Sequence, residues 1–176
     1  MNYLFVIASA FTYAIFFIFN DFFFRSFGLS EYVSLLFIPS GIRIFFALVF
    51  DIYGVIGILL GSLLVSLFYL NQSNLTVVVT TALVAGGAAW VARWASIKLL
   101  KLDVNLGRIK LMDLMQLSII FSGISAISHQ VLFVQLGMSD DFTTGALSMF
   151  AGDMTGALFC LVTARFAVQL IRRKRY

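Results

Sequence analysis

Long apolar runs separated by short polar segments dominate the hydrophobic pattern of the chain. A helix that spans a bilayer needs about 20 mostly apolar residues, and six segments meet this requirement: about 3–20, 31–51, 54–71, 75–97, 113–137 and 142–168. Lipid offers no partner to backbone N–H and C=O groups, so each segment is expected to be a helix, although its Phe and Val residues favour strands in water. The pattern predicts an all-α polytopic membrane bundle, a single integral membrane domain over residues 1–176.

Lysine and arginine are distributed unevenly among the predicted loops. Eight of them lie in the fourth loop and the C-terminal tail, namely Lys98, Lys101, Arg108, Lys110, Arg172, Arg173, Lys174 and Arg175. The loops on the opposite side contain one, Arg25. Because positive residues in short loops mark the cytoplasmic side, both termini are predicted to be cytoplasmic. The chain is then a multi-pass protein of the inner (plasma) membrane, and its net charge of +4 indicates topology and contact with membrane lipid, not with nucleic acid.

Composition agrees with this interpretation. Of the 176 residues, 61% are hydrophobic and 11% are charged, against about 45–50% and 25% in soluble domains. No basic segment precedes the first apolar run, so we expect it to be retained as a span, and the start at Met1 and the basic end favour a whole small protein. Motifs for phosphate, dinucleotide or nucleophilic chemistry are absent from the sequence, so we expect neither an enzyme nor a cofactor. The single cysteine, Cys160, excludes an intrachain disulfide and is expected to be a small apolar filler.

Two opposite charges are predicted near the middle of the bilayer. Arg43 lies about 18 Å into the second span from Glu31, and Asp153 about 16 Å into the sixth from Phe142. An unpaired charge at this depth costs at least about 2.5–3.5 kcal/mol, so we expect the two side chains to pair or to share a polar cavity. The pair either fixes helix register or forms part of a functional site. Arg93 and Arg165, by contrast, lie near cytoplasmic ends and are expected to anchor the helices there.

Further polar and helix-breaking residues lie at a similar depth. His129, the single histidine, is either a pH or ligand sensor or a satisfied hydrogen-bonding group, and no second ligand beside it indicates a metal site. Pro39 and Gly41 are expected to break or bend the second span, which would make a polar pocket with Ser40 that opens to the outer side. Alternatively, the proline only kinks a packed helix.

Glycines recur at close-packing spacing in three spans: Gly57, Gly61, Gly86, Gly87, Gly152 and Gly156. Such residues let helix backbones approach closely in lipid. They pack either within the bundle or on a face that binds a second copy or another membrane protein. The fourth loop, residues 98–112, interleaves basic and apolar residues, which is typical either of an interfacial helix on anionic lipid or of a plain basic loop.

Three segments also resemble a known family. Pro39-Ser40-Gly41, the following Gly54-x-x-Gly57 and Leu60-Gly61-Ser62, and the late Gly152-Asp153-x-x-Gly156 are similar to the motifs of membrane-associated sensor domains of the first MASE type. The chain departs from that family at Phe37-Ile38, where Trp-Pro is usual, and at Arg43, where an apolar residue is usual. The resemblance implies signal transduction at a bacterial inner membrane. Family members continue into an output domain that this chain lacks, so signals are expected to pass to a partner in trans.

The sequence thus leaves three functions to compare. The first is a membrane sensory or ligand-binding domain whose pocket contains Pro39, Ser40, Arg43, His129 and Asp153. The second is a small transporter or a substrate-binding transport subunit, which would use the same charges and the broken helix. The third is a structural subunit of a larger membrane complex, held by the glycine faces.

Overall fold

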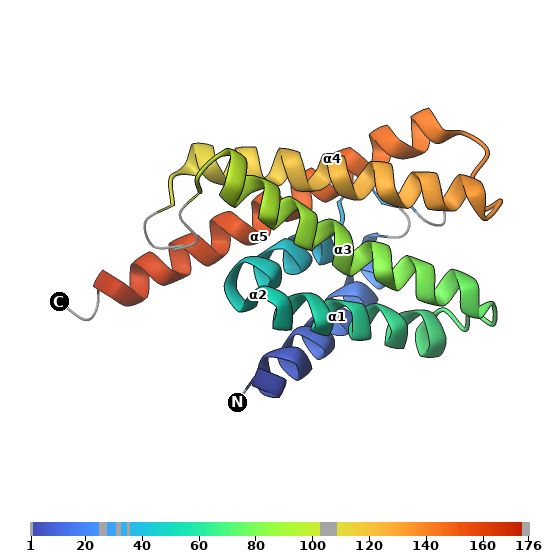
Figure 1. Cartoon of the computed structure of the whole chain (residues 1–176), viewed down its shortest axis with the longest axis horizontal. Coiled ribbons are helices and arrows are strands. Elements are labelled where there is room, and N and C mark those ends of the chain that lie inside the picture. The colour runs from blue at the N-terminus through green and yellow to red at the C-terminus, as the bar shows by residue number, and fades with distance from the viewer. Residues whose placement is uncertain (1, 25–27, 31–32, 35, 103–108, 174–176) are drawn as a thin grey trace.

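The computed structural model describes residues 2–24, 28–30, 33–34, 36–102 and 109–173, which form five long helices and one short strand pair (Figure 1). The helices are α1 (Asn2–Phe24), α2 (Ile38–Leu64), its π-helical continuation η2 (Val65–Tyr69), α3 (Leu75–Leu99), α4 (Leu111–Gln135) and α5 (Phe142–Arg173). Strands β1 (Gly28–Ser30) and β2 (Val33–Ser34) pair antiparallel between α1 and α2. All five helices, with η2 included in the second, are long and apolar enough to cross a membrane. The prediction of a helical, multi-pass membrane protein is confirmed.

Helix α2 folds back on itself at Asp51. This residue has φ 55° and ψ −136°, which are not helical values, and lies between helical segments. Phe46 and Gly54 would be about 12 Å apart along a straight helix, yet a Cβ added at Gly54 would contact the carbonyl oxygen of Phe46. The helix therefore consists of two arms, 38–50 and 52–64, which run in opposite directions in Figure 1.

The second and third predicted spans are both found in this folded helix, so the described residues contain five long helices where six were expected. The expected helix over 31–51 is wrong at its start, because residues 33–34 form β2 and the helix begins at Ile38. Pro39 therefore lies in the first helical turn, where its fixed φ and missing N–H are favourable. It does not bend a longer helix. When η2 is counted with α2, the other helix ends lie within five residues of the predicted bounds.

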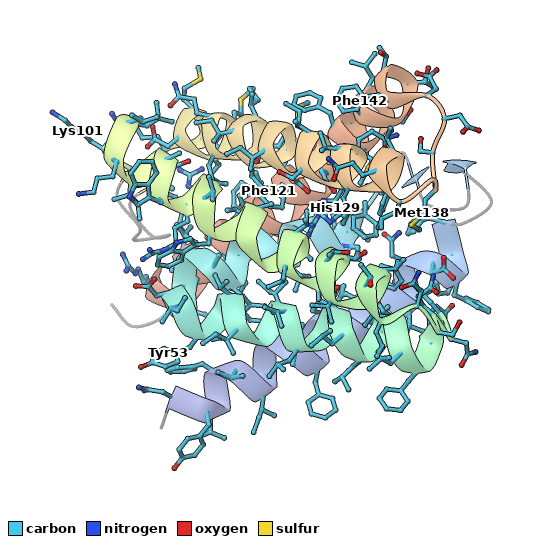
Figure 2. All side chains as sticks on the ribbon, turned by 45° about the vertical axis from the view of Figure 1, so that its right-hand side comes forward. Tyr53, Lys101, Phe121, His129, Met138 and Phe142 are labelled. Carbon is cyan, nitrogen blue, oxygen red and sulfur yellow. The ribbon has the colours of Figure 1, made fainter. Side chains whose placement is uncertain are left out.

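The loops alternate between two ends of the bundle. Both termini, the fold at Asp51 and the end of α3 lie at the left in Figure 1, and the loop at 70–74 and the α4–α5 loop lie at the right. In Figure 2, Tyr53 and Lys101 mark the first end, and Met138 and Phe142 mark the second. Contacts agree with this arrangement, since Asn2 donates a hydrogen bond to the Tyr53 hydroxyl at 2.8 Å. The described residues of the basic fourth loop, 98–102 and 109–112, thus lie at the same end of the bundle as both termini. Residues 103–108 of this loop, where an interfacial helix was considered, lie outside the described residues.

Helix α2 occupies the centre of the bundle and packs against α1, α3 and α5. One core cluster joins the first arm to α4 and α5 around Ile44, Phe121 and Leu161. A second joins α1, both arms and α3, and includes Tyr13 and Ile58. Large apolar side chains cover the outward faces of α1 and α5, which is the distribution that lipid favours.

Most of the predicted packing glycines contact helices of the same chain. A Cβ at Gly57 would lie 2.5 Å from the Cβ of Ser9, and one at Gly61 would lie 2.6 Å from the carbonyl oxygen of Ala10, both on α1. A Cβ at Gly86 would lie 3.3 Å from the α2 backbone, but one at Gly87 would have no neighbour within 4 Å. The first three therefore hold α1, α2 and α3 together, and Gly87 does not.

Candidate functional site

The start of α2 is held inside the bundle by groups from α1 and α5. The first N–H groups of a helix, here at positions 37–40, have no partner within the helix. Phe37 donates to the carbonyl oxygen of Gly152 at 3.2 Å, and the next N–H donates to Oδ1 of Asn20 at 2.9 Å. The third position is the proline, and the N–H of Ser40 lies 3.1 Å from the carbonyl oxygen of Phe37. All of the N–H groups at these four positions therefore have partners.

This helix start lies deep in the bundle. Gly152 is ten residues beyond Phe142, and therefore about 15 Å from the start of α5. Because the backbone of Phe37 is bonded to Gly152, α2 begins at about half the depth of a hydrocarbon core of about 30 Å. Non-helical backbone at this depth is tolerated only where protein covers it or a cavity surrounds it, and here α1 and α5 supply the cover.

Two of the three segments that resemble the sensor family, Pro39-Ser40-Gly41 and Gly152–Gly156, pack directly against each other. A Cβ at Gly156 would contact the carbonyl oxygen of Phe37, and a Cβ at Gly41 would contact the carbonyl oxygen of Gly156. The hydroxyl of Ser40 lies 2.9 Å from the carbonyl oxygen of Asp153. Glycine at 41 and 156 is therefore required by the close approach of α2 and α5.

Arg43 and Asp153 form an ion pair between these two helices, as the depth estimate predicts. Nη2 of Arg43 lies 3.1 Å from Oδ1 and 3.3 Å from Oδ2 of Asp153, and each side chain is 2% exposed. The guanidinium carbon also lies 5.2 Å from the ring centroid of Phe121 and 5.7 Å from that of Phe37. The positive charge is thus balanced by one carboxylate and two aromatic faces, which is what makes it tolerable inside a membrane.

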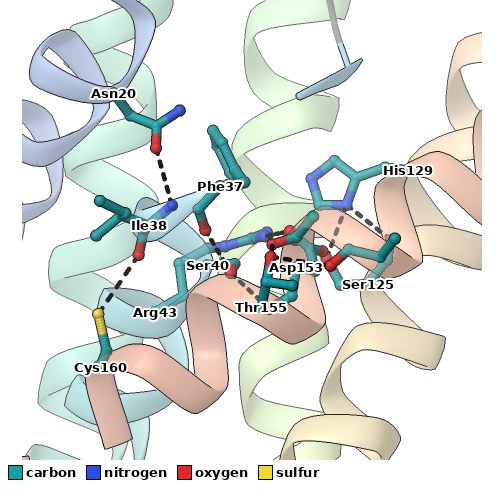
Figure 3. A network of polar contacts seen from close by, with 12 residues as sticks. Asn20, Phe37, Ile38, Ser40, Arg43, Ser125, His129, Asp153, Thr155 and Cys160 are labelled. Atoms are coloured by element: carbon teal, nitrogen blue, oxygen red, sulfur yellow. Dashed lines mark hydrogen bonds and ion pairs between the residues drawn. The ribbon is translucent and has the colours of Figure 1, made fainter. Parts of the chain in front are cut away.

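Helix α4 adds two polar side chains to this pair (Figure 3). The hydroxyl of Ser125 is within hydrogen-bonding reach of the Asp153 carboxylate. Nδ1 of His129 lies 2.9 Å from the carbonyl oxygen of Ser125. Because a carbonyl oxygen only accepts, this contact places the proton on Nδ1 and leaves Nε2 as an acceptor. We call Ser40, Arg43, Ser125, His129 and Asp153 the polar cluster.

The polar cluster gathers most of the predicted site residues, and Pro39 is buried beside it in the first turn of α2. All five of its side chains are buried, Ser40 and Ser125 completely so. The predicted opening to the outer side is therefore wrong for these residues. The cluster lies between α2, α4 and α5 and is closed to solvent.

A second ion pair lies at the end of the bundle that holds both termini. Nη1 of Arg93 lies 3.0 Å from Oδ1 of Asp51, whose side chain is 53% exposed. The guanidinium of Arg93 also lies 5.7 Å from the ring centroid of Trp90. This pair connects α3 to the fold of α2. It differs from the Arg43–Asp153 pair in its access to solvent.

Two members of the site were not predicted from the sequence. Asn20 is buried and caps the start of α2, but it stands at the end of the first apolar run, where a polar residue usually ends a span. Ser125 belongs to the polar run SAISHQ around His129, which was a usable signal. Its contact with Asp153 depends on how α4 is rotated, and the spacing of the sequence does not fix that rotation.

The described residues contain no group of three or more His, Cys, Asp and Glu side chains that could hold a metal ion. Sγ of Cys160 lies 3.7 Å from the carbonyl oxygen of Ile38 and 2.6 Å from where a Cβ at Gly41 would be. The cysteine is therefore packed into the α2–α5 contact. Chemically, the site offers charge, hydrogen bonds and aromatic faces.

Comparison with known proteins adds no identification. No protein-family model matches the chain, and neither the curated proteins nor the solved structures contain a match. The resemblance to membrane-associated sensor domains therefore rests on the sequence motifs alone.

Proposed function

We propose that the chain is a sensory or ligand-binding domain of the plasma membrane that acts through partner proteins. The observation that supports this most directly is the buried ion pair of Arg43 and Asp153 at about half the depth of the bilayer. Ionisable residues inside a membrane are costly and usually mark a functional site. Here the pair also lies where two of the three segments that resemble a sensor family are in contact. A signal that alters the pair would therefore act on the packing of α2 against α5.

We further propose six crossings, with both termini in the cytoplasm. The two arms of α2 run in opposite directions, and the described residues that precede the first arm include the short strands β1 and β2. Lys98, Lys101 and Lys110 lie at the same end as the N-terminus, and short loops rich in lysine and arginine remain cytoplasmic. An even number of crossings is required for both termini to share that side.

A transporter is the second candidate, because transport sites are commonly built from helices that begin inside the membrane. In such sites the free N–H groups of a half-helix bind an anionic substrate. At the start of α2 these groups are bonded to Gly152, Asn20 and Phe37. The helix start is thus used for internal packing, and for this reason we prefer sensing to transport.

A third candidate, a structural subunit of a larger complex, would use the same ion pair only to fix the contact of two helices.

The proposal is tested by native mass spectrometry of the protein purified gently from its own membrane. We expect a bound small molecule or a signalling protein with the wild type and its loss with Asp153→Asn, because the substitution removes the charge that Arg43 pairs with. Asp51→Asn is the matched control, since it removes a carboxylate from an exposed ion pair and should leave binding unchanged.

Two other results would contradict the sensor proposal. A partner of fixed stoichiometry that survives Asp153→Asn, without any bound small molecule, would make the chain a structural subunit. Proton or solute flux in liposomes that is abolished by Asp153→Asn would instead identify a transporter.

A further inference from the structure

Four polar residues form a narrow stripe along α4. They are spaced at four, three and four residues: Ser118, Ser122, Ser125 and His129. At about 3.6 residues per turn this spacing places them within an arc of about 60°. All four side chains are buried, and the three serines have no exposed surface. A row of buried polar side chains therefore runs along α4, and Ser125 and His129 at one end of this row belong to the polar cluster.

The two halves of this stripe differ in their hydrogen bonding. His129 bonds to Ser125, and the hydroxyl of Ser125 is within hydrogen-bonding reach of Asp153. The hydroxyl groups of Ser118 and Ser122, by contrast, have no hydrogen-bond partner within the described residues. A buried hydroxyl without a partner is unfavourable and is rare in folded proteins.

A third group without a partner comes from another helix. Nε of Arg43, in a side chain that is 2% exposed, also has no hydrogen-bond partner within the described residues. Arg43 lies five residues beyond Ile38, and therefore about 7.5 Å from the start of α2 toward the end with the termini. Its side chain reaches back to Asp153, as helical side chains do. Nε thus lies on the side of the ion pair that faces the termini.

Ser122 and Ser118 lie on the same side of the ion pair. The chain of α4 runs from the end with the termini outward, so these residues are about 4.5 Å and 10.5 Å from Ser125 toward that end. The guanidinium of Arg43 lies over the ring of Phe121, the residue that precedes Ser122. Beyond Ser118, the fully buried side chains of Leu114 and Leu117 separate the stripe from the basic end.

We propose that water molecules bind between Nε of Arg43 and the hydroxyl groups of Ser122 and Ser118, so that the ion pair is part of an internal hydrated site. A water molecule accepts from Nε, which only donates, and donates to a serine hydroxyl, which both accepts and donates. Buried waters make about three such bonds each to otherwise unpaired groups. The inference does not depend on the sensor proposal. It rests on three buried polar groups from two helices.

The dry alternative is that each serine hydroxyl donates to the carbonyl oxygen four residues earlier in α4, as serines in membrane helices often do. Ser9 of α1 provides an internal example of that geometry, because its fully buried hydroxyl donates to the carbonyl oxygen of Phe5 at 2.7 Å. Ser9 is thus the matched control for both measurements below.

Water-edited solid-state NMR of serine-labelled, full-length protein in lipid bilayers tests the site directly. We expect magnetisation from water to reach the Cβ signals of Ser118 and Ser122 several times faster than that of Ser9. Equal and slow transfer to all three would overturn the proposal. The comparison requires no substitution except those needed to assign the signals.

Alanine substitutions give a second, independent readout because the two alternatives predict effects of different size. If water binds at the stripe, Ser122→Ala removes a partner of that water and lowers the melting temperature by about 2–4 °C. If the hydroxyl instead donates to the carbonyl oxygen four residues earlier, Ser122→Ala should change the melting temperature no more than Ser9→Ala does, because both substitutions remove the same local hydrogen bond. Ser118→Ala should behave like Ser122→Ala, and Ser9→Ala should have the smaller effect. No decrease in either α4 variant would contradict the hydrated site.

Discussion

Arg43 and Arg93 show how the same residue type takes different roles at different depths. The carboxylate partner of Arg43 is 2% exposed, and that of Arg93 is 53% exposed. Water screens an exposed pair, which typically contributes about 0–1 kcal/mol. Breaking a buried pair by removal of one partner costs about 3–5 kcal/mol, because the other charge is left without compensation. The consequences of mutation should therefore differ sharply between the two pairs.

The first prediction concerns the buried pair. Arg43→Ala and Asp153→Ala should each lower the free energy of unfolding by about 3–5 kcal/mol. The double variant should be clearly more stable than the sum of the two losses indicates, because it leaves no unpaired charge. Thermal or denaturant unfolding of the detergent-solubilised protein, followed by tryptophan fluorescence, measures the coupling.

The exposed pair supplies the control for this double-mutant cycle. Asp51→Asn should change stability by about 1 kcal/mol or less. Strict additivity of Arg43→Ala and Asp153→Ala would mean that the two residues do not interact in the folded protein.

At the scale of elements, the contact of α2 with α5 is the most specific feature of the fold. The backbone of α2 approaches α5 so closely that side chains at Gly41 and Gly156 would overlap main-chain atoms. Two consequences follow. The start of α2 can exchange hydrogen bonds with Gly152, and Arg43 is brought within reach of Asp153.

The second prediction tests the α2–α5 contact by substituting glycine with alanine both inside this contact and elsewhere in the bundle. Gly41→Ala and Gly156→Ala should sharply reduce the yield of monodisperse protein in detergent and its melting temperature. Gly87→Ala and Gly123→Ala introduce the same methyl group where no atom lies within 4 Å, so they should be neutral or slightly stabilising, because alanine favours helix. Equal effects at all four positions would show that the close α2–α5 contact is not formed.

The third prediction concerns Asp141, which precedes the candidate membrane-spanning helix α5. Hydrogen bonds from the side chain and backbone of Thr144, and from the backbone of Thr143, lower the pKa of Asp141 below its ordinary value of 3.8. The carboxylate therefore contributes stability above the unfolded-state pKa, and this contribution is lost as the pH falls through the lowered pKa of the folded state.

Thr144→Val removes the hydroxyl donor and should raise the pKa of Asp141 toward 3.8. Carboxyl carbon shifts followed by NMR between pH 2 and 6 report this change. Thr155→Val, farther along the same helix, should leave the titration of Asp141 unaltered. An unchanged pKa in Thr144→Val would mean that the hydroxyl does not bond to the carboxylate.

Four of the six predicted spans were found as separate helices, because lipid restricts a spanning chain to helices of a set length, and the other two are joined in α2. The estimate of depth along the helices was sufficient to relate Arg43 to Asp153. The start of α2 at Ile38 was not predictable, since β2 and Asn20 replace hydrogen bonds that a longer helix would supply. The predicted bounds 31–51 and 54–71 left a short connection after Asp51, but they did not indicate the unusual φ of this residue, which depends on how the two arms of α2 pack.

At the scale of the whole molecule, the two ends of the bundle differ in their loops and in their charged residues. One end contains both termini, the fold at Asp51 with its partner Arg93, and the described lysines of the fourth loop. The other contains the strand pair, the uncharged loop 70–74, and the α4–α5 loop with its aspartates. Such asymmetry orients a membrane protein with the basic end in the cytoplasm.

The last prediction tests that orientation and the number of crossings together. In a Cys160→Ala background, a cysteine at Ser73 should react with a membrane-impermeant maleimide in intact cells. A cysteine at Asn105, and one added after the C-terminus, should react only after the membrane is permeabilised.

If α2 crossed the membrane once, the two termini would lie on opposite sides. A cysteine added before Met1 therefore distinguishes five crossings from six. With six crossings, this cysteine and the one after the C-terminus are both protected in intact cells. With five crossings, one of these two cysteines is labelled. Protection of Ser73→Cys together with labelling of both termini would keep six crossings but invert the orientation, and the positive charge would then lie on the outer side.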